Sequence, residues 1–312
     1  MSTPTLATVT ASDRRWVLRF TRTERVAHWL QALTFLSLML TGLAISLAPV
    51  EALIGHRSLL REAHLASALF FVFGPTLVAL AGNRRAVAAD AEDVDRWTDD
   101  DLHWLARPQL EPGPSTPPTG KFNAGQKLNA IFVAYSTFAF GLTGLILWQN
   151  RRFPTGVVSQ ANVIHTDLAY IALAVFLGHV YLAAVHRATR PALHGMVFGT
   201  VRREWAARHH VLWQGAPFES RLTAAAAVRA AFLFLVGSEV ALLLVRALFE
   251  ALGANPTDAV TGFVYALTAL PATIGHHATG VGAFDLAALF WAGLIGALWI
   301  GLRRGQDVVA RP

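Results

Sequence analysis

Two histidines on one apolar stretch are the first residues that could do chemistry. Residues 162–187 read NVIHTDLAYIALAVFLGHVYLAAVHR, with His165 near one end and His179 fourteen positions later. On a helix the two side chains lie roughly 21 Å apart along the axis and within about 40° of the same face. A polar ring in hydrocarbon is by default paired or functional, and a neutral imidazole is a ready ligand for haem iron. The pattern predicts iron-ligating histidines at two depths of one membrane helix.

Two further histidines lie at matching depths on other apolar segments. His28 stands at the start of one segment, in RVAHWL, and His64 at the start of the next, in REAHLA. Because successive membrane spans run in opposite directions, His28 matches the depth of His179, and His64 matches that of His165. We therefore predict two haem b groups, each held between two imidazoles, one near each membrane surface.

The composition is that of a membrane protein. Of its 312 residues, 54% are hydrophobic and 15% are charged, which is more apolar than a water-soluble domain needs. The chain has no cysteine, which excludes disulfides, cysteine-ligated iron–sulfur clusters and thioether-bound haem. By length and hydropathy we predict six spans, at about residues 26–47, 60–81, 128–148, 162–187, 225–248 and 283–302.

The basic residues predict the orientation of these spans. Twenty of the 26 Lys and Arg lie in the N-terminal segment, the 82–127 and 187–221 loops and the C-terminal tail, and four lie in the two short loops opposite. By the positive-inside rule both termini are expected in the cytoplasm. The net charge of +6 follows from this topology and does not indicate a nucleic-acid partner. No cleaved signal peptide is recognisable in residues 1–25.

The remaining polar segments are predicted to lie outside the hydrocarbon. Residues 82–127, acidic and then proline-rich, are expected to form a solvated loop. Residues 205–213 are interpreted as an amphipathic interfacial stretch. His186 competes with His179 as a ligand because it lies seven residues further on nearly the same face, but we expect it at the interface. Three other histidines are expected to be solvated: His56, His103 and His194.

One tetrapeptide occurs twice. Leu-Thr-Gly-Leu stands at residues 40–43 and again at 142–145, near the external ends of the first and third spans. Gly42 lies fourteen residues after His28, on nearly the same face. A glycine there lets a porphyrin plane approach the backbone, and a helix-packing contact between small residues is an equally good interpretation.

Several segments together resemble a known family. They are RVAHWLQALTFLSLMLTGL, GKFNAGQKLN, the helix with His165 and His179, and GMVFGTVRREWAARHHVLW. In this order, over about residues 14–213, the chain is similar to the cytochrome b (gamma) subunit of membrane-bound formate dehydrogenases. Apolar helices with histidines would be a weak basis alone, whereas GKFNAGQK combined with WAARHH is specific.

The resemblance implies a function for these residues. It implies His28 and His179 as ligands of the cytoplasmic-side haem b, His64 and His165 as ligands of the external one, and a site for menaquinone or ubiquinone at Asn123, Gly125 and Gln126, near His179. Asn123 at the cytoplasmic start of a span is also a good helix cap, which is the structural alternative.

The implied reaction is a redox loop across the bacterial inner membrane. Electrons from an iron–sulfur (beta) subunit would reach the quinone, and the quinone would take its protons from the cytoplasm. The chain would be the quinone-reducing subunit of an oxidoreductase. Formate oxidation itself would belong to a molybdenum or tungsten catalytic (alpha) subunit.

The C-terminal part departs from this family. We divide the chain into a cytoplasmic segment at 1–25, a di-haem four-helix domain at 26–215, and a two-helix extension at 216–312 that resembles the YggT-like membrane family. Glu239 is predicted to lie within a span, where an acid is a functional candidate, and an internal pair with Arg246 or a partner contact is the favoured interpretation. His276 and His277 have no partner histidine at their depth, so no third haem is expected.

The fold class predicted is thus an all-α membrane protein, a four-helix di-haem cytochrome b bundle with about two additional helices. Two other functions remain open from the sequence. The chain can serve as the cytochrome b of a hydrogenase or another molybdoenzyme, or as a membrane anchor or assembly protein without haem.

Overall fold

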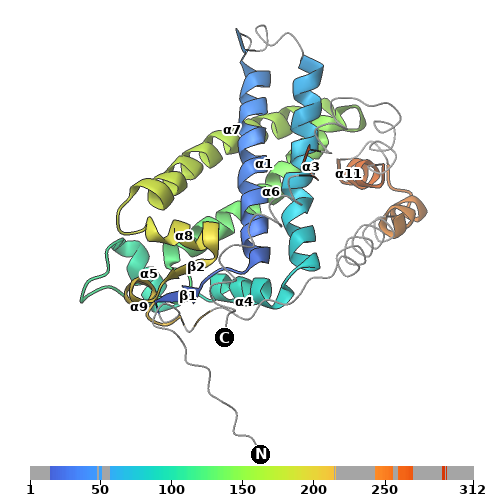
Figure 1. Cartoon of the computed structure of the whole chain (residues 1–312). Coiled ribbons are helices and arrows are strands. Elements are labelled where there is room, and N and C mark those ends of the chain that lie inside the picture. The colour runs from blue at the N-terminus through green and yellow to red at the C-terminus, as the bar shows by residue number, and fades with distance from the viewer. Residues whose placement is uncertain are drawn as a thin grey trace, which may run out of the picture.

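The computed structural model describes residues 15–47, 49–50, 57–213, 215, 243–255 and 259–269, together with 290, 291 and 293. Within them, four long helices form the body of the molecule (Figure 1), and each is long and apolar enough to cross a membrane. They are α1 (Arg22–Ser46), α3 (Arg57–Ala81), α6 (Ala124–Trp148) and α7 (Thr155–Val180). The four-helix part of the predicted fold is therefore confirmed.

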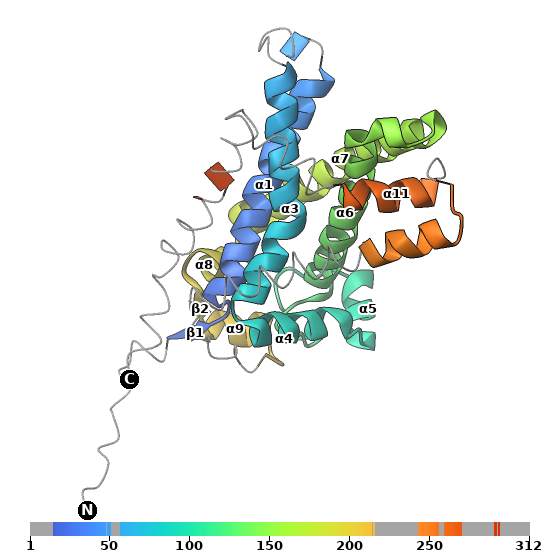
Figure 2. The ribbon, with the colours of Figure 1, turned by 90° about the vertical axis from the view of Figure 1, so that its right-hand side faces the viewer.

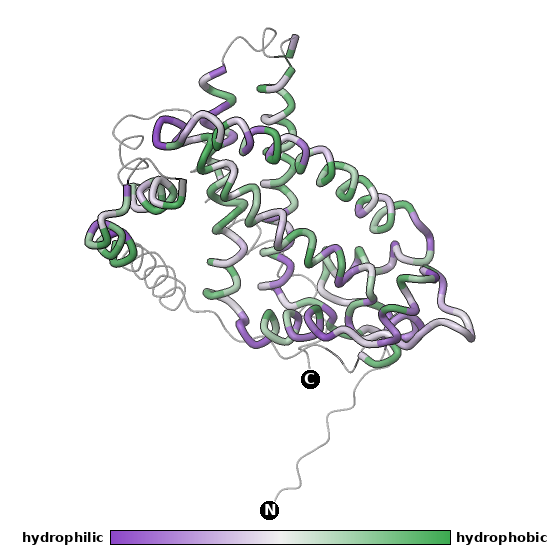
Figure 3. The backbone as a smooth tube through the Cα atoms, turned by 180° about the vertical axis from the view of Figure 1, so that it is seen from behind, coloured by the Kyte–Doolittle hydropathy of each residue, from purple (hydrophilic) through white to green (hydrophobic). Residues whose placement is uncertain are grey.

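The helices pack mainly as consecutive pairs. α1 packs along α3, and α6 packs against α7, while α3 also contacts α6; Figure 2 shows α1 and α3 side by side. In the most apolar part of α7, 6% of the residues are buried within the protein. This outward apolar surface suits contact with lipid, and Figure 3 shows hydrophobic residues along the long helices.

Three of the four helices begin three or four residues earlier than the apolar runs indicate. The extra residues at two of these starts belong to capping boxes, in which a cap side chain and a side chain three residues later satisfy free backbone N–H groups. Thr21 and Glu24 form this box at α1, and Asn123 and Gln126 form it at α6. Hydropathy does not register such polar first turns, which explains the difference.

Short elements gather at one end of the four helices (Figure 1). They are β1 (Trp16–Leu18), α4 (Arg84–Asp95), α5 (Asp99–Ala106), α8 (Pro191–Phe198), β2 (Thr200–Arg202) and α9 (Arg203–His209). We call these six elements the cap, the end of the bundle that they cover the capped end, and the opposite end the open end.

A two-stranded antiparallel sheet joins the two ends of the described bundle in the cap. β1 pairs with β2 in a register that places Val17 opposite Val201. Gly199 makes the turn from α8 into β2 with a φ of +87°, and its carbonyl accepts hydrogen bonds from the backbone N–H groups of Arg19 and Phe20. This contact ties the start of α1 to a segment about 180 residues later.

Two sequence expectations for the cap were wrong. Residues 82–127 are not a solvated loop throughout, because they form α4 and α5, and the buried Asp101 accepts a salt bridge from the buried Lys127 at 3.0 Å. Residues 205–213 are not simply an interfacial stretch, because Trp205 is buried in the cap and its indole N–H donates to the carbonyl of Ala188. Both segments have tertiary partners that their sequences do not indicate.

Part of the C-terminal extension is described. Residues 243–251 are helical, and α11 (Ala259–Thr268) packs on α6, with Ala266 buried against Leu145 and Phe153. Arg246 forms an ion pair with Glu250 at 2.9 Å. Glu239, His276, His277 and most of the fifth and sixth predicted spans lie outside the described residues, so those predictions stay untested.

Candidate functional site: two histidine pairs between the long helices

The four predicted histidines meet in two pairs. The imidazole centres of His28 on α1 and His179 on α7 lie 6.2 Å apart, with the ring planes inclined at 45°. Those of His64 on α3 and His165 on α7 lie 6.4 Å apart, inclined at 57°. The first pair lies near the capped end and the second toward the open end, so the pairing deduced from depth agrees with the structure.

The spacing within each pair fits an iron ion between the rings. Two metal–nitrogen bonds of about 2 Å, with roughly 1 Å from each nitrogen to its ring centre, separate the ring centres by about 6 Å. Both observed separations agree with this value. Rings stacked directly on one another would be closer, and neither pair is linked by a hydrogen bond among the described contacts. The chemistry of the donors also fits, since two neutral imidazoles are common axial ligands of haem b.

At the open end, each imidazole contacts a threonine of the repeated tetrapeptide. The Nδ1 atom of His64 lies 2.8 Å from the hydroxyl of Thr41, and that of His165 lies 2.8 Å from the hydroxyl of Thr143. The repeat is visible in the sequence, but no role was predicted for its threonines. The recurrence of the same four residues at the same depth could have indicated a shared role for the threonines.

At the capped end, the surroundings of the ring differ. The Nδ1 atom of His28 is buried and has no hydrogen-bond partner in the part of the chain that the structure describes. The neighbouring helix start is instead anchored to α8: the indole of Trp29 donates to the carbonyl of Met196, and Arg25 donates to that of Val197. Within the described part of the chain, the ring of His28 thus lacks the Nδ1 partner that the rings of His64 and His165 have.

His179 is followed by an irregular turn. Residues Tyr181–Val185 form a π-helical segment directly after α7, a feature often found at functional sites. Beyond it, the Nδ1 atom of His186 lies 3.2 Å from the hydroxyl of Thr189. This histidine therefore contacts the segment that links α7 to α8 and not His28. The structure thus favours His179 over His186 as the partner of His28.

The predicted quinone residues stand at the start of α6. Asn123 accepts a hydrogen bond from the backbone N–H of Gln126 at 2.9 Å, and Gln126 accepts one from that of Asn123 at 3.0 Å. Gly125 packs tightly there, because a Cβ atom would lie 3.0 Å from the ring of Trp104. Asn123 therefore caps the helix, as the structural alternative predicted. The capping box leaves the amide NH₂ groups of Asn123 and Gln126 unused.

A small cavity opens beside these residues. Its volume is about 40 Å³, and its lining includes Asn123, Gln126, Trp104, Trp205 and His209. This is room for about three water molecules. His179, which the resemblance places near the quinone, is not among the described residues that line the cavity.

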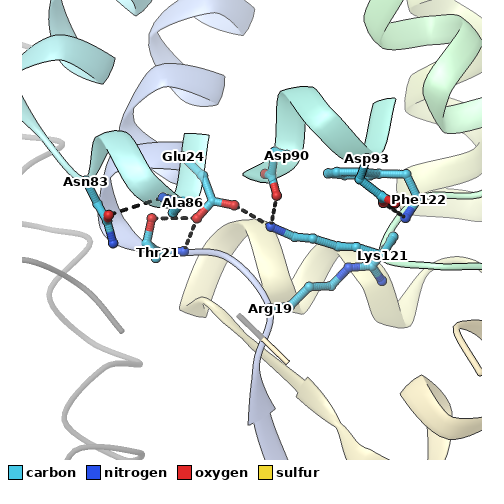
Figure 4. A network of polar contacts seen from close by, with 9 residues as sticks. All are labelled: Arg19, Thr21, Glu24, Asn83, Ala86, Asp90, Asp93, Lys121 and Phe122. Carbon is cyan, nitrogen blue, oxygen red and sulfur yellow. Dashed lines mark hydrogen bonds and ion pairs between the residues drawn. The ribbon is translucent and has the colours of Figure 1, made fainter. Parts of the chain in front are cut away.

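The cap contains a buried charge cluster that sequence reasoning missed (Figure 4). The ammonium of Lys121 lies 2.5 Å from a carboxylate oxygen of Glu24 and 2.5 Å from one of Asp90. Arg19, fully buried, donates to the backbone carbonyl of Lys121 at 2.8 Å. Burial and the adjacent Glu24 carboxylate raise the pKa of Asp90 to about 8, and burial lowers the pKa of Arg19 to about 9.

Two histidines of the cap, His194 and His210, make packing contacts and hydrogen bonds to the backbone. His194 was expected to be solvated, but its ring stacks on Trp16 at 4.4 Å and bonds to the carbonyl of Thr200. His210 is buried and bonds to the carbonyl of Gly120 at 2.8 Å. His103 is exposed, as expected, and His56 lies outside the described residues.

Comparison with known proteins identifies the family. The model of the family described as prokaryotic cytochrome b561 matches residues 19–199, more than half of the chain, and this range includes all four paired histidines. The chain belongs to the prokaryotic cytochrome b561 family. Membership in a cytochrome b family implies haem b as the prosthetic group, which the paired rings fit.

Individual relatives are cytochrome subunits of formate dehydrogenases. The chain is 34% identical over 97 residues to the cytochrome b556(Fdn) subunit of the nitrate-inducible formate dehydrogenase of Escherichia coli K12, a match that covers 30% of this chain and 43% of that subunit. It is 24% identical over 209 residues to the formate dehydrogenase cytochrome b556 subunit of Haemophilus influenzae, covering 65% and 84%. It is 26% identical over 206 residues to the cytochrome b556(fdo) subunit of Escherichia coli K12, covering 64% and 92%.

Proposed function

We propose that this chain is the membrane cytochrome b subunit of a formate dehydrogenase complex, in which electrons pass from an iron–sulfur subunit to a quinone. The observation that carries the proposal is the two histidine pairs, whose ring centres are 6.2 and 6.4 Å apart and which share the single helix α7. The relatives described above, which are named as such subunits, support the choice of complex.

The chain's own residues would hold two haem b groups. His28 and His179 would be the axial ligands of one, and His64 and His165 those of the other. Haem b, when bound, supplies a one-electron carrier within the hydrocarbon. Because α7 would provide one ligand to each pair, the fourteen-residue spacing of His165 and His179 would set the distance between the two sites.

The quinone site is proposed at the capped end, around Asn123, Gly125 and Gln126. The capping box uses the side-chain oxygens of Asn123 and Gln126 as acceptors. Their NH₂ groups are then oriented as donors, the kind of group that binds a quinone carbonyl. The cavity beside them gives water a place next to the donors, as protonation of a reduced quinone requires.

The chain is proposed to lie in the inner membrane of a bacterium. The distribution of basic residues supports an orientation in which the cap and both termini are cytoplasmic. An iron–sulfur subunit would then dock at the open end, with the molybdenum or tungsten catalytic subunit beyond it. Formate would be oxidised on that subunit, while this chain would anchor the complex and reduce menaquinone or ubiquinone.

The test is a haem count on the purified chain and its single His→Ala variants, by pyridine haemochrome and by reduced-minus-oxidised optical spectra. Two b haems per wild-type chain are expected. His28→Ala and His179→Ala should each lose the same haem, and His64→Ala and His165→Ala should each lose the other.

His186→Ala is the matched control, since it removes a histidine from the same segment and should leave both haems. A wild-type chain without haem would contradict the proposal and support the anchor alternative. To test the partner, formate should reduce the haems when the chain is purified with its native complex. Reduction by hydrogen and not by formate would indicate a hydrogenase partner.

A further inference from the structure

The two Leu-Thr-Gly-Leu repeats make the same contact in two different helix pairs. In α1 the hydroxyl of Thr41 lies 2.8 Å from Nδ1 of His64 on α3. In α6 the hydroxyl of Thr143 lies 2.8 Å from Nδ1 of His165 on α7. The two histidines of the open-end pair are therefore each approached, on the side away from Nε2, by a threonine of a neighbouring helix.

The hydrogen of each threonine hydroxyl is already committed to the helix. Thr41 donates to the carbonyl of Ser37 at 2.7 Å, and Thr143 donates to that of Ala139 at 2.7 Å. A hydroxyl has one hydrogen to donate and two lone pairs that can accept. Each hydroxyl must consequently accept from the histidine, so Nδ1 carries the proton and Nε2 carries the lone pair.

We propose that Thr41 and Thr143 are positioning residues that fix the Nδ1–H tautomer and the ring plane of His64 and His165, so that both Nε2 lone pairs are presented to one haem iron. This inference rests on the proposed function and extends it to two residues that do not touch the iron. Partners of this kind orient a ligating imidazole and increase its basicity.

The glycine of each repeat lies against the same imidazole ring that the threonine contacts. A Cβ atom on Gly42 would lie 3.3 Å from Cε1 of His64, and one on Gly144 would lie 3.6 Å from Cε1 of His165. The repeat therefore brings the backbone up to the edge of the imidazole while the preceding threonine holds its Nδ1. From the sequence, porphyrin access and helix packing were equally good interpretations of this glycine, and the described contact is with the imidazole ring.

A third threonine shows that the bond to the histidine is separate from the bond to the helix. Thr34 lies on α1, is fully buried, and donates to the carbonyl of Leu30 at 2.7 Å. It thus makes the same backbone contact as Thr41, two turns away, with no histidine among its hydrogen-bond partners. Thr34 is for this reason the matched control.

The proposal is tested with Thr41→Val, Thr143→Val, Thr41→Ser and Thr34→Val in the full chain carrying its haems. His64→Ala first assigns the optical and EPR signals of the open-end haem. Less basic ligands stabilise ferric iron less, so each Val variant should raise the midpoint potential of that haem. The expected change in the ratio of reduced to oxidised haem at fixed potential is severalfold, up to about tenfold, which is ~59 mV for a one-electron couple.

A second readout concerns ring orientation. The largest g value of a low-spin ferric haem depends on the angle between its two imidazole planes, so it should shift in both Val variants for the open-end haem alone. Thr41→Ser, which keeps the hydroxyl, should restore the wild-type potential and g value, and Thr34→Val should leave both unchanged. A variant that loses the open-end haem while Thr41→Ser retains it also supports the positioning role.

Unaltered potential and g values in Thr41→Val and Thr143→Val, with both haems present, would overturn the inference while leaving the proposed function intact. An equal shift in Thr34→Val would overturn it as well, because the effect would then belong to the helix. Absence of haem from the wild-type chain is the separate outcome that overturns the proposed function.

Discussion

At the open end, His64 and His165 each contact a threonine hydroxyl at 2.8 Å, whereas at the capped end the Nδ1 atom of His28 has no hydrogen-bond partner within the described residues. The open-end rings are thus held by side chains of adjacent helices, each directly followed in sequence by the glycine that lies against the ring. At the capped end, the side chains of Arg25 and Trp29 donate to backbone carbonyls of α8 and fix the start of α1 against it.

The difference indicates that the two pairs depend on different parts of the molecule. The threonine contacts that hold the open-end rings lie between helices that are neighbours in sequence, α1 with α3 and α6 with α7. The capped-end pair joins the first long helix to the last, and the cap supplies the contacts that bridge them. Disrupting the cap should consequently affect one pair, and disrupting the Leu-Thr-Gly-Leu repeats should affect the other.

The largest effect is expected from Lys121→Met. This change leaves Glu24 and Asp90 facing each other without their buried cation, and removing one partner of a buried ion pair costs about 3–5 kcal/mol. Because Glu24 lies one turn before His28, we expect the capped-end haem to be lost and the open-end haem to be retained. Haem counting and the optical spectrum measure this directly.

Asp90→Asn is the matched control for Lys121→Met. The pKa of Asp90 is raised to about 8 by burial and by the Glu24 carboxylate, so a neutral amide is a milder replacement here than for an ordinary carboxylate. The variant should keep both haems. Loss of both haems in Lys121→Met, or of neither, would contradict the idea that the cap serves the capped-end pair alone.

A smaller and opposite effect is expected from Gly42→Leu. A Cβ atom at Gly42 would already lie 3.3 Å from the His64 ring, so a larger side chain must displace the imidazole, and overpacking of this kind typically costs about 1–3 kcal/mol. We expect weaker retention of the open-end haem with no change at the capped end, measured as haem content after dilution and washing.

Gly178 provides the control at the other pair. It precedes His179 on α7, and no described atom lies within 4 Å of the Cβ position. Gly178→Leu should therefore leave haem content unchanged although it adjoins His179. Equal losses in the two variants would show that glycine is needed for helix geometry rather than for access of the ring at Gly42.

The sequence allowed the four helices and both histidine pairs to be predicted because the information is local. Hydropathy marks the spans, and the fourteen-residue spacing of His165 and His179 sets two depths that His64 and His28 then match. The contacts of Thr41 and Thr143 with the two histidine rings were not predicted. They depend on the register between adjacent helices, which hydropathy does not determine.

The cap could not be predicted for a different reason. Strands of three residues carry no recognisable periodicity, and the pairing of Val17 with Val201 spans nearly the whole described bundle. The partners of Lys121 likewise come from two elements distant in sequence, Glu24 on α1 and Asp90 on α4. Polar segments such as residues 82–127 look solvated when their buried partners are unknown.

The smallest expected effect is a dependence of the cap on pH. His210 is buried and its ring bonds to the carbonyl of Gly120. Burial, and after it the charge of Arg19, lowers the pKa of His210 to about 2. The unfolded chain, with an ordinary histidine pKa of about 6.5, binds a proton below that pH that the folded chain does not. The free energy of unfolding should accordingly fall as the pH drops below about 6.5, by on the order of 1 kcal/mol per pH unit.

The measurement is the melting temperature of the detergent-solubilised chain between pH 7.5 and 5, in wild type and in His210→Gln. Asp90 has a raised pKa and contributes with the opposite sign over this range, so only the difference between the two slopes isolates His210. The variant should show the flatter profile, and the wild type should release its capped-end haem first on acidification. His103→Gln, at an exposed position, should follow the wild type. Identical slopes in wild type and His210→Gln would mean that the cap does not exclude the charged imidazole, and release of the open-end haem first would invert the assignment of the cap to the His28 and His179 pair.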